Sequence, residues 1–384
     1  MKAASSLVVG LGALEAAERA TGEVLEELGG VADLAILFAS SSYWDEAGSL
    51  LGGLRAALGP VPLVGCVAQG VIGRAREVED EPAVSLWVAN GFPAPVETFA
   101  VEYLATASGG LFAGHRFEAG GGPYLVFSDP FSLPLEELLL HLNINVPGVL
   151  VAGGVASGGL ERRRSELFLD GEVLHEGAVG AHLPGGQADL LVSQGCRPLG
   201  NPYTVTKAEG PMVAEIGGRP AYERLERLVA DIRQDERALL ADGGLLLGVA
   251  MDEYRDRQGR GDFLARGVLG VDPETGGVLV AGEIEVGQTV QFLARDAASA
   301  GQDLGDALER ELAALAGRGP AGVLLFTCNG RGSRLFPTPD HDAGMVAKIL
   351  GPIPTAGFFA AGELGPVGGK NFLHAFSASF AVFR

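Results

Sequence analysis

The sequence predicts an α/β protein with mixed sheets, built from pseudo-symmetric repeats of a strand-helix-strand-strand unit in two domains. The phrase Gly-x-x-Ala-x-Gly occurs three times, at residues 65–70, 153–158 and 357–362. Each copy follows a proline by a few residues, and similar apolar runs flank each copy in the same order. A repeat of this size cannot bury its sheet alone, so we expect the copies to pack together with their glycine loops at equivalent places.

The elements of each repeat follow from apolar runs separated by polar breaks. In the first repeat, residues 35–40 and 83–89 predict strands and residues 50–58 predict a helix. The matching segments are 322–327, 377–383 and 345–350 in the last repeat, and 124–127, 177–182 and 135–142 in the second. Strands that alternate with helices but also form tight hairpins favour mixed rather than purely parallel sheets.

The chain has 384 residues, which is too long for one core and indicates two domains. Residues 197–202 carry the proline and glycine of a connector, so we predict domains at 1–200 and 201–384. The second domain is expected to begin with a helix over residues 221–240, followed by a buried strand at 245–251 and a hairpin turn at 272–277. Whether this stretch is a diverged fourth copy stays open, because it lacks the glycine phrase.

Composition excludes several classes of protein. The formal net charge is −20 and no basic stripe opposes it, so nucleic-acid binding is not expected. Hydrophobic residues make up 47% of the chain, yet no uninterrupted apolar run approaches the roughly 18 residues of a membrane helix. Acidic residues directly follow the short apolar run at 7–14, which argues against a signal peptide. We therefore expect a soluble, cytoplasmic protein without membrane insertion.

The glycine loops themselves have two interpretations. Backbone N–H groups at such strand ends can bind an anion such as a carboxylate or phosphate. Close packing of backbone, where only glycine and alanine fit, is the other interpretation and the favoured one. Neither the Walker loop nor the dinucleotide-binding glycine pattern is present, so nucleotide binding by those routes is not expected.

Polar side chains gather in the last repeat at predicted strand ends, where they should converge at one rim of a sheet. Arg331 could grip a carboxylate bidentately, and Glu363 or Asp342 could receive an ammonium, so a free amino acid is a sensible ligand. An internal network of ion pairs that fastens the loops is an equally good explanation for each single residue. The predicted ligand contacts are Asn329, Arg331, Asp342, Glu363 and Asn371, with Gln69, Asp129 and Arg164 as weaker counterparts in the other repeats.

One position distinguishes the last repeat from the first. After the final glycine of the phrase, the first copy continues with Val71 and the last with Glu363. A carboxylate in place of a valine at an otherwise shared turn makes Glu363 the first place to look for a ligand.

Two other chemistries are weaker hypotheses. Cys66 and Cys328 both follow strands, so a thiol enzyme with His341 or His374 as base is conceivable. The three cysteines include no Cys-x-x-Cys pair and the histidines no His-x-x-x-His spacing, so no disulfide framework or zinc site is implied. No metal or cofactor is expected, although His374 could ligate a haem iron.

The chain resembles the FIST sensory proteins over nearly its whole length, with both the N-terminal and the C-terminal FIST regions. The most telling segments are Cys-Asn-Gly-Arg-Gly at 328–332 and the last glycine phrase with its continuation to Pro366. The other matching segments are residues 33–38, 63–73, 128–131, 202–210, 287–292 and 371–374.

This resemblance implies a ligand-sensing module of signal transduction, suggested for the family to bind small molecules such as amino acids. Some FIST proteins are described as haem-binding nitric-oxide sensors, which gives the alternative function. Relatives often carry an output domain, and this sequence has no room for one. We therefore expect any signal to pass through a separate partner protein.

Overall fold

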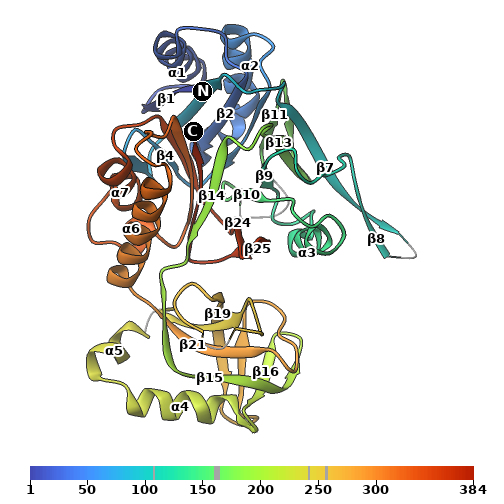
Figure 1. Ribbon diagram of the computed structural model, residues 1–384, viewed down its shortest axis with the longest axis vertical. Helices are drawn as coiled ribbons and strands as arrows, with labels where there is room; N and C mark the ends of the chain where they lie inside the picture. Colours follow the sequence, from blue (N-terminus) through green and yellow to red (C-terminus); the bar gives the residue numbers. More distant parts are fainter. Residues whose placement is uncertain (107–108, 160–164, 241–242, 256–257) are drawn as a thin grey trace. The chain divides into compact units, whose positions relative to one another are not determined.

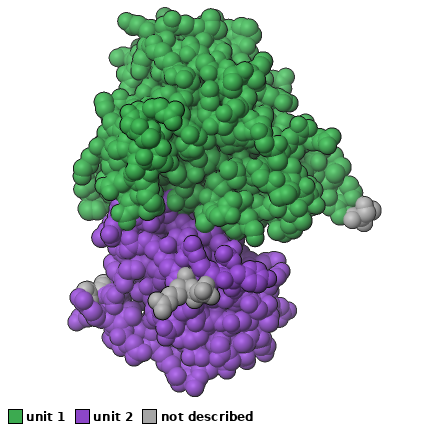
Figure 2. Space-filling view, in the orientation of Figure 1, with its two compact units in different colours: residues 1–192, 305–373, 377–384 green, residues 193–304, 374–376 purple. Residues whose placement is uncertain are grey.

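The computed structural model describes residues 1–106, 109–159, 165–240, 243–255 and 258–384. The chain forms two compact units (Figure 2): unit 1 comprises residues 1–192, 305–373 and 377–384, and unit 2 comprises residues 193–304 and 374–376. The domain boundary predicted near residue 200 divides the chain along its sequence. In space the last repeat packs with the first two, so both compact units are discontinuous in sequence.

Unit 1 contains three mixed sheets built on one plan (Figure 1), which confirms the predicted fold class. Each sheet has a parallel strand pair at its centre and an antiparallel strand beside the first member of that pair. The parallel pairs are β2 (Leu34–Ser40) with β3 (Leu63–Ala68), β9 (Tyr124–Ser128) with β10 (Val151–Val155), and β22 (Gly322–Cys328) with β23 (Thr355–Ala360). The antiparallel neighbours are β6 (Ala83–Asn90), β13 (Ala178–His182) and β26 (Ala378–Phe383).

Outer strands extend the three sheets on the side of that antiparallel neighbour. They are β1 (Lys2–Val9) in the first sheet, β7 (Glu97–Thr106) and β8 (Gly109–Ala113) in the second, and β14 (Ala188–Ser193) in the third.

On the other side, each sheet is completed by a hairpin from a different repeat. The hairpin that follows the glycine phrase of the first repeat joins the third sheet, that of the second repeat joins the first sheet, and that of the third repeat joins the second sheet. This cyclic exchange ties the three repeats together. The hairpins are β4 (Val71–Gly73) with β5 (Arg76–Val78), β11 (Leu167–Leu169) with β12 (Glu172–Leu174), and β24 (Glu363–Val367) with β25 (Lys370–His374).

The first glycine of each phrase lies where the parallel strands approach most closely. A Cβ added at Gly65, Gly153 or Gly357 would lie 1.7, 2.0 or 1.8 Å from a carbonyl oxygen of the neighbouring strand. No side chain can occupy such a position, so these glycines are required by packing. The favoured interpretation of the phrase therefore accounts for its first glycine.

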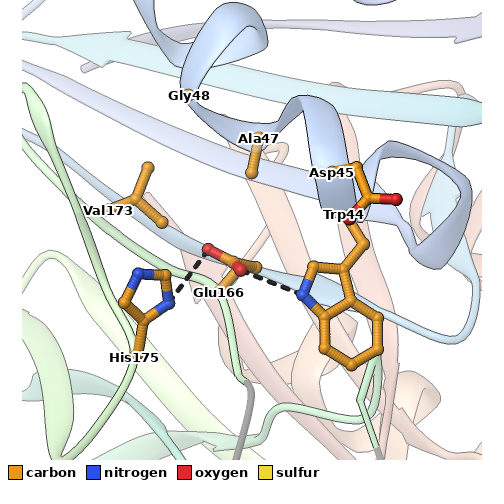
Figure 3. A pocket seen from close by; sticks show the side chains of 7 residues that line it. All are labelled: Trp44, Asp45, Ala47, Gly48, Glu166, Val173 and His175. Carbon is orange, nitrogen blue, oxygen red and sulfur yellow. Dashed lines mark hydrogen bonds and ion pairs between the residues drawn. The ribbon is translucent and has the colours of Figure 1, made fainter.

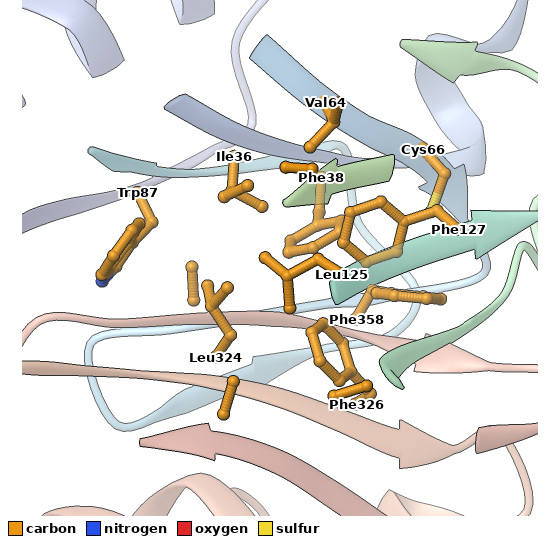
Figure 4. Packing of buried hydrophobic residues seen from close by; sticks show 14 of the residues in the cluster. Ile36, Phe38, Val64, Cys66, Trp87, Leu125, Phe127, Leu324, Phe326 and Phe358 are labelled. Atoms are coloured by element: carbon orange, nitrogen blue, oxygen red, sulfur yellow. The ribbon is translucent and has the colours of Figure 1, made fainter. Parts of the chain in front are cut away.

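Three phenylalanines from equivalent positions in the three sheets meet in the centre of unit 1 (Figure 4). Phe38, Phe127 and Phe326 each lie one residue after the strand partner of one of these glycines. Their ring centroids are 5.2 Å apart for Phe38 and Phe127, 6.2 Å for Phe38 and Phe326, and 5.7 Å for Phe127 and Phe326, in edge-to-face arrangements. Such aromatic contacts stabilise the core beyond the effect of burying the rings. The three sheets thus share one aromatic core.

Helices cover the outer faces of the sheets. α1 (Ala13–Leu28) and α2 (Ala47–Leu58) pack on the first sheet, and α3 (Leu135–Asn145) packs on the second. α1 buries a face of alanines at helical spacing and ends at Gly29, whose left-handed conformation (φ 66°) closes the helix. α7 (His341–Leu350) belongs to the last repeat, and α6 (Ala297–Ala314) precedes that repeat in the sequence.

Unit 2 is built differently and does not form a fourth copy. Its strands pair antiparallel wherever their register is described, whereas each repeat of unit 1 contains a parallel pair. The strand order is β15 (Cys196–Glu209), β21 (Thr289–Arg295), β18 (Leu245–Ala250), β19 (Phe263–Asp272), β20 (Gly277–Val280), β16 (Met212–Ile216) and β17 (Arg219–Pro220). The predicted strand at 245–251 and the turn at 272–277 are present.

The single helix predicted over residues 221–240 is wrong. The chain forms α4 (Ala221–Asp231) and α5 (Gln234–Leu239), separated by Ile232 in an extended conformation (ψ 156°). A Glu236 side chain that caps the backbone N–H of Arg233 starts the second helix, and periodicity alone does not reveal that restart. No helix in the described part of the chain is both long and apolar enough to cross a membrane.

We expect Gly65→Ala to destabilise the protein by more than about 3 kcal/mol, because its Cβ would collide with the carbonyl oxygen of Leu37. Gly52→Ala is the matched control, since Gly52 lies within α2 with open space around its Cβ position. That substitution should stabilise by about 0.5–1 kcal/mol. Urea denaturation of both variants measures the difference, and equal stabilities would contradict the packing role of Gly65.

Candidate functional site

A group of buried polar and charged side chains lies where the strands of the last repeat end. Cys328 ends β22, and Glu363 begins β24 after the glycine phrase. Arg331 lies in the loop after β22, and Asp342 in the first turn of α7. All four side chains are buried, and Arg331 and Glu363 are fully inaccessible to solvent. We call these four residues the strand-end cluster.

Arg331 and Asp342 form a bidentate ion pair. Arg331 Nε donates to Asp342 Oδ2 at 2.7 Å and Nη2 donates to Oδ1 at 2.9 Å. The Thr327 hydroxyl also donates to Oδ2 at 2.7 Å, and His341 Nδ1 lies 2.8 Å from Oδ1. Burial disfavours the Asp342 carboxylate, but Arg331 and these hydrogen bonds hold its pKa well below the usual range. The pair fixes the guanidinium in one orientation.

Glu363 is a buried carboxyl at a position that is apolar in the other repeats. The strand register places Glu363 where Val71 and Leu167 stand in the other two hairpins. Its Oε2 accepts hydrogen bonds from the backbone N–H of Ser377 at 3.1 Å and from the Ser377 hydroxyl at 2.7 Å. Burial raises the pKa of Glu363 to about 8, although the bonds from Ser377 oppose that rise. Near pH 7 this carboxyl therefore carries a proton in most molecules.

Two buried atoms of opposite polarity in the cluster lack a hydrogen-bond partner. They are Nη1 of Arg331 and Oε1 of Glu363, whose parent side chains interact electrostatically. Buried polar atoms are nearly always paired with protein or water, so each unpaired one calls for an explanation. Here one atom donates and the other accepts.

The exchanged hairpin of the first repeat completes this region. The backbone N–H groups of Asp342 and Ala343 donate to Glu77 Oε1 at 2.7 and 2.9 Å, so Glu77 caps the first turn of α7. Glu79 accepts hydrogen bonds from the backbone and hydroxyl of Ser333. Burial and the nearby Asp342 charge raise the pKa of Glu77 to about 7. Sequence reasoning missed Glu77, because nothing local shows which sheet its hairpin joins.

The other residues predicted as ligand contacts have structural partners elsewhere in unit 1. Asn371 Oδ1 accepts the N–H of Val151, and its amide group contacts Asn143, which fastens β25 to β10 and α3. Asp129 accepts the N–H groups of Phe131 and Ser132 in the loop before α3.

A third predicted ligand contact, Gln69, lies in the first repeat. Gln69 is half-buried and its backbone N–H donates to the Ser157 hydroxyl at 2.8 Å. Asn329, in the last repeat, is half-buried beside Cys328. Arg164 lies outside the described residues. The strand ends therefore bring Asn329, Arg331, Asp342 and Glu363 into one region, while Asn371 and Asp129 serve other loops.

The predicted cysteine and histidine candidates occupy different environments. Cys66 is fully buried in the aromatic core, and burial raises the pKa of its thiol well above the usual range, which disfavours the nucleophilic thiolate. His374 belongs to unit 2, where it is 2% exposed and its Nδ1 lies 3.3 Å from Gln194 Nε2. His374 does not line any of the three cavities described, and haem binding stays a prediction. No group of three or more metal-binding side chains occurs among the described residues.

A cavity of about 650 Å³ lies at the corresponding place in the first repeat (Figure 3). Trp44 Nε1 donates to Glu166 Oε1 at 2.9 Å, and His175 Nδ1 lies 3.3 Å from Glu166 Oε2. In the hairpin that joins the first sheet, Val173 occupies the position that Glu77 occupies in the hairpin that joins the third sheet. The first turn of α2 thus faces the cavity without the carboxylate that caps α7. Its lining residues are Trp44, Asp45, Ala47, Gly48, Glu166, Val173 and His175.

Comparison with known proteins covers almost the whole chain. The FIST N domain model matches residues 33–219 and the FIST C domain model matches residues 221–366. An uncharacterized protein of Mycobacterium tuberculosis (strain ATCC 25618 / H37Rv) is 49% identical over 370 residues, which cover 96% of each chain. An uncharacterized protein of Mycobacterium bovis (strain ATCC BAA-935 / AF2122/97) is 47% identical over 373 residues, covering 97% of this chain and 96% of its own.

The raised pKa of Glu363 predicts a specific dependence of stability on pH. A carboxyl that ionises near its model value of 4.5 when unfolded but at about 8 when folded binds more protons in the folded state between those values. The free energy of unfolding should therefore fall as pH rises from 5 to 8, with a slope of about 1.4 kcal/mol per pH unit from this group.

Glu77 and Glu311, whose pKa values are raised to about 7, contribute in the same direction. The difference between the wild type and Glu363→Leu isolates the effect of Glu363, since both proteins keep the other two groups. Urea denaturation at several pH values gives this difference. A difference that is constant between pH 5 and 8 would mean that Glu363 ionises normally.

Proposed function

Because the chain belongs to the FIST family, we propose that it is a non-catalytic, small-molecule-binding sensory protein whose ligand is an amino acid or a related carboxylate metabolite. The ligand would bind at the strand-end cluster of the last repeat, with Arg331 and Glu363 as its principal contacts. A signal would pass from there to a separate partner protein.

The observation that carries this proposal is the pair of unpartnered buried atoms. Leaving a buried donor or acceptor unpaired costs about 1–3 kcal/mol, more for a charged group. A carboxylate placed against Arg331 Nη1 and an ammonium placed against Glu363 Oε1 would give both atoms a partner. An α-amino acid carries both groups.

Position and chemistry within the repeats support the same assignment. The other two hairpins carry Val71 and Leu167 where this one carries Glu363, so the hairpin can join its sheet without a carboxyl. Asp342 binds Nε and Nη2 of Arg331 and leaves Nη1 unbound. In this proposal Asp342 orients the guanidinium rather than contacting the ligand. Asn329, half-buried at the end of β22, would add a polar contact.

A thermal-denaturation screen against amino acids and simple carboxylates tests the proposal. A ligand at about 100 times its Kd should add about 2.7 kcal/mol to the free energy of unfolding. Glu363→Leu should abolish that gain while keeping the fold, since Leu167 occupies the equivalent place in the second hairpin. Arg331→Ala is a poorer test, because loss of one partner of a buried ion pair costs about 3–5 kcal/mol.

Glu311→Leu is the matched control. Glu311 is also a buried carboxyl with a raised pKa and an unpaired Oε1, but it lies in α6 beside Asp189 and Arg384. Its variant should keep the ligand-induced gain. A gain that survives Glu363→Leu would place the ligand elsewhere, for example in the cavity beside Trp44, and no gain from any compound would reject amino-acid sensing.

A further inference from the structure

We infer that the cavity beside Trp44 is a second binding site, which takes an organic ammonium ion with an apolar body and uses Glu166 as the carboxylate that receives the ammonium. The cavity lies in unit 1, and none of its described lining residues belongs to the strand-end cluster. This inference therefore does not depend on the ligand proposed for that cluster.

Glu166 stands where the other two exchanged hairpins carry glycine. It directly precedes the first strand of its hairpin, as Gly70 and Gly362 precede theirs. The backbone arrangement is the same in all three hairpins. The carbonyl oxygens of Glu166, Gly70 and Gly362 each accept a backbone N–H from the strand that the hairpin joins, at 2.8, 3.0 and 2.8 Å. The hairpin needs only the backbone at this position, so the carboxyl side chain of Glu166 calls for another explanation.

The Glu166 carboxylate is buried and held in one orientation between Trp44 and His175 (Figure 3). Glu166 is 8% exposed, Trp44 Nε1 donates to its Oε1 at 2.9 Å, and His175 Nδ1 lies 3.3 Å from its Oε2. His175 Nδ1 also lies 3.3 Å from the carbonyl oxygen of Ser165. Both neighbours of Nδ1 are acceptors, so we assign the ring hydrogen to Nδ1. Donors at both oxygens favour the charged carboxylate, and each oxygen of a carboxylate can accept more than one hydrogen bond.

Trp44 and the apolar lining suit the rest of such a ligand. Cations are attracted to the face of an aromatic ring, and tryptophan gives the strongest attraction. Ala47 and Val173 add apolar surface, and Asp45 adds a second carboxylate. The cavity volume of about 650 Å³ lies within the range of roughly 300–1,000 Å³ that is usual for small-molecule sites. Carboxylate, indole and apolar surface together form the combination that recognises an organic ammonium ion.

The exchanged hairpin explains why this place is open in the first repeat. In the last repeat, Glu77 caps α7 and Glu79 accepts hydrogen bonds from Ser333. The strand register aligns Val173 with Glu77, so His175 follows at the position of Glu79. Val173 has no polar atom to cap α2, and the His175 side chain is 60% exposed. These two side chains therefore line the cavity instead of closing it.

Isothermal titration calorimetry of the full-length protein with phenethylamine tests the inference. Phenethylamine carries an ammonium on a short apolar body, and 3-phenylpropionate carries a carboxylate on a similar body. We expect saturable binding of phenethylamine, at least about tenfold tighter than that of 3-phenylpropionate, since Glu166 pairs with the ammonium and repels the anion. The inference is wrong if phenethylamine does not bind, or binds no more tightly than 3-phenylpropionate.

Glu166→Gln removes the charge of the side chain and keeps its size. This substitution should weaken phenethylamine binding at least about tenfold, the effect expected when a charge-assisted hydrogen bond is lost. Glu46→Gln is the matched control, because Glu46 is an exposed carboxylate close to Trp44 in the sequence that does not line the cavity. Its affinity should stay within about twofold of the wild type, since exposed charges are screened. Equal affinities of the Glu166→Gln and Glu46→Gln proteins would reject Glu166 as the anchor.

Gly48→Leu tests the cavity without changing a charged group. Gly48 lines the cavity and has open space around its Cβ position, so leucine should keep the fold, occupy the cavity and abolish binding. Circular dichroism shows whether each variant is folded, and Gly48→Leu decides the question if Glu166→Gln does not fold. Wild-type affinity in Gly48→Leu overturns the inference. Binding that is lost in Glu363→Leu but kept in Glu166→Gln also overturns it, because the amine would then occupy the strand-end cluster.

Discussion

Three close approaches between backbones set the architecture of unit 1. At Gly65, Gly153 and Gly357 the neighbouring carbonyl oxygen would lie within 2.0 Å of any Cβ, so the parallel pairs form only with glycine there. Each of these glycines also pairs on its other side with the exchanged hairpin, opposite Phe168, Leu364 and Ile72 in turn. One local requirement therefore fixes both the parallel pair and the strand that arrives from another repeat. The edge-to-face phenylalanines at the next register position then fill the centre that the three sheets enclose.

The exchange has a direct consequence for the strand-end cluster. Cys328 belongs to the third sheet, but Glu363 begins the hairpin that crosses to the second sheet. Glu77 reaches the first turn of α7 from the hairpin of the first repeat. Side chains from two sheets and two repeats thus meet at one place, which neither an isolated repeat nor an isolated sheet could provide. Asp342 gains partners on both sides, with Arg331 at its carboxylate and Glu77 at its backbone.

The sequence was sufficient for features that depend on local pattern and on register. The three glycine phrases mark equivalent loops, and their comparison alone singles out Glu363. The helix break at Ile232 and the cap by Glu77 escaped prediction, since each depends on the conformation or partner of a particular side chain. The sequence does not decide between a ligand and an internal ion pair as the partner of Arg331, because a carboxylate from either source fits a guanidinium. The ligand contacts themselves stay a prediction.

Arg331 and Glu363 illustrate why burial alone does not identify a functional residue. The bidentate pair with Asp342 uses two nitrogens of Arg331 and is explained as a structural link between the loop after β22 and α7. Glu363 is not explained in this way. Burial opposes the charge of its carboxylate, and only Oε2 is hydrogen-bonded to Ser377. The other two hairpins carry the apolar residues Val71 and Leu167 at this position. A fold that accepts an apolar side chain twice does not require a carboxyl at the third equivalent place. We therefore propose that Glu363 serves ligand binding, in which its unpaired oxygen and the fixed guanidinium of Arg331 would take part.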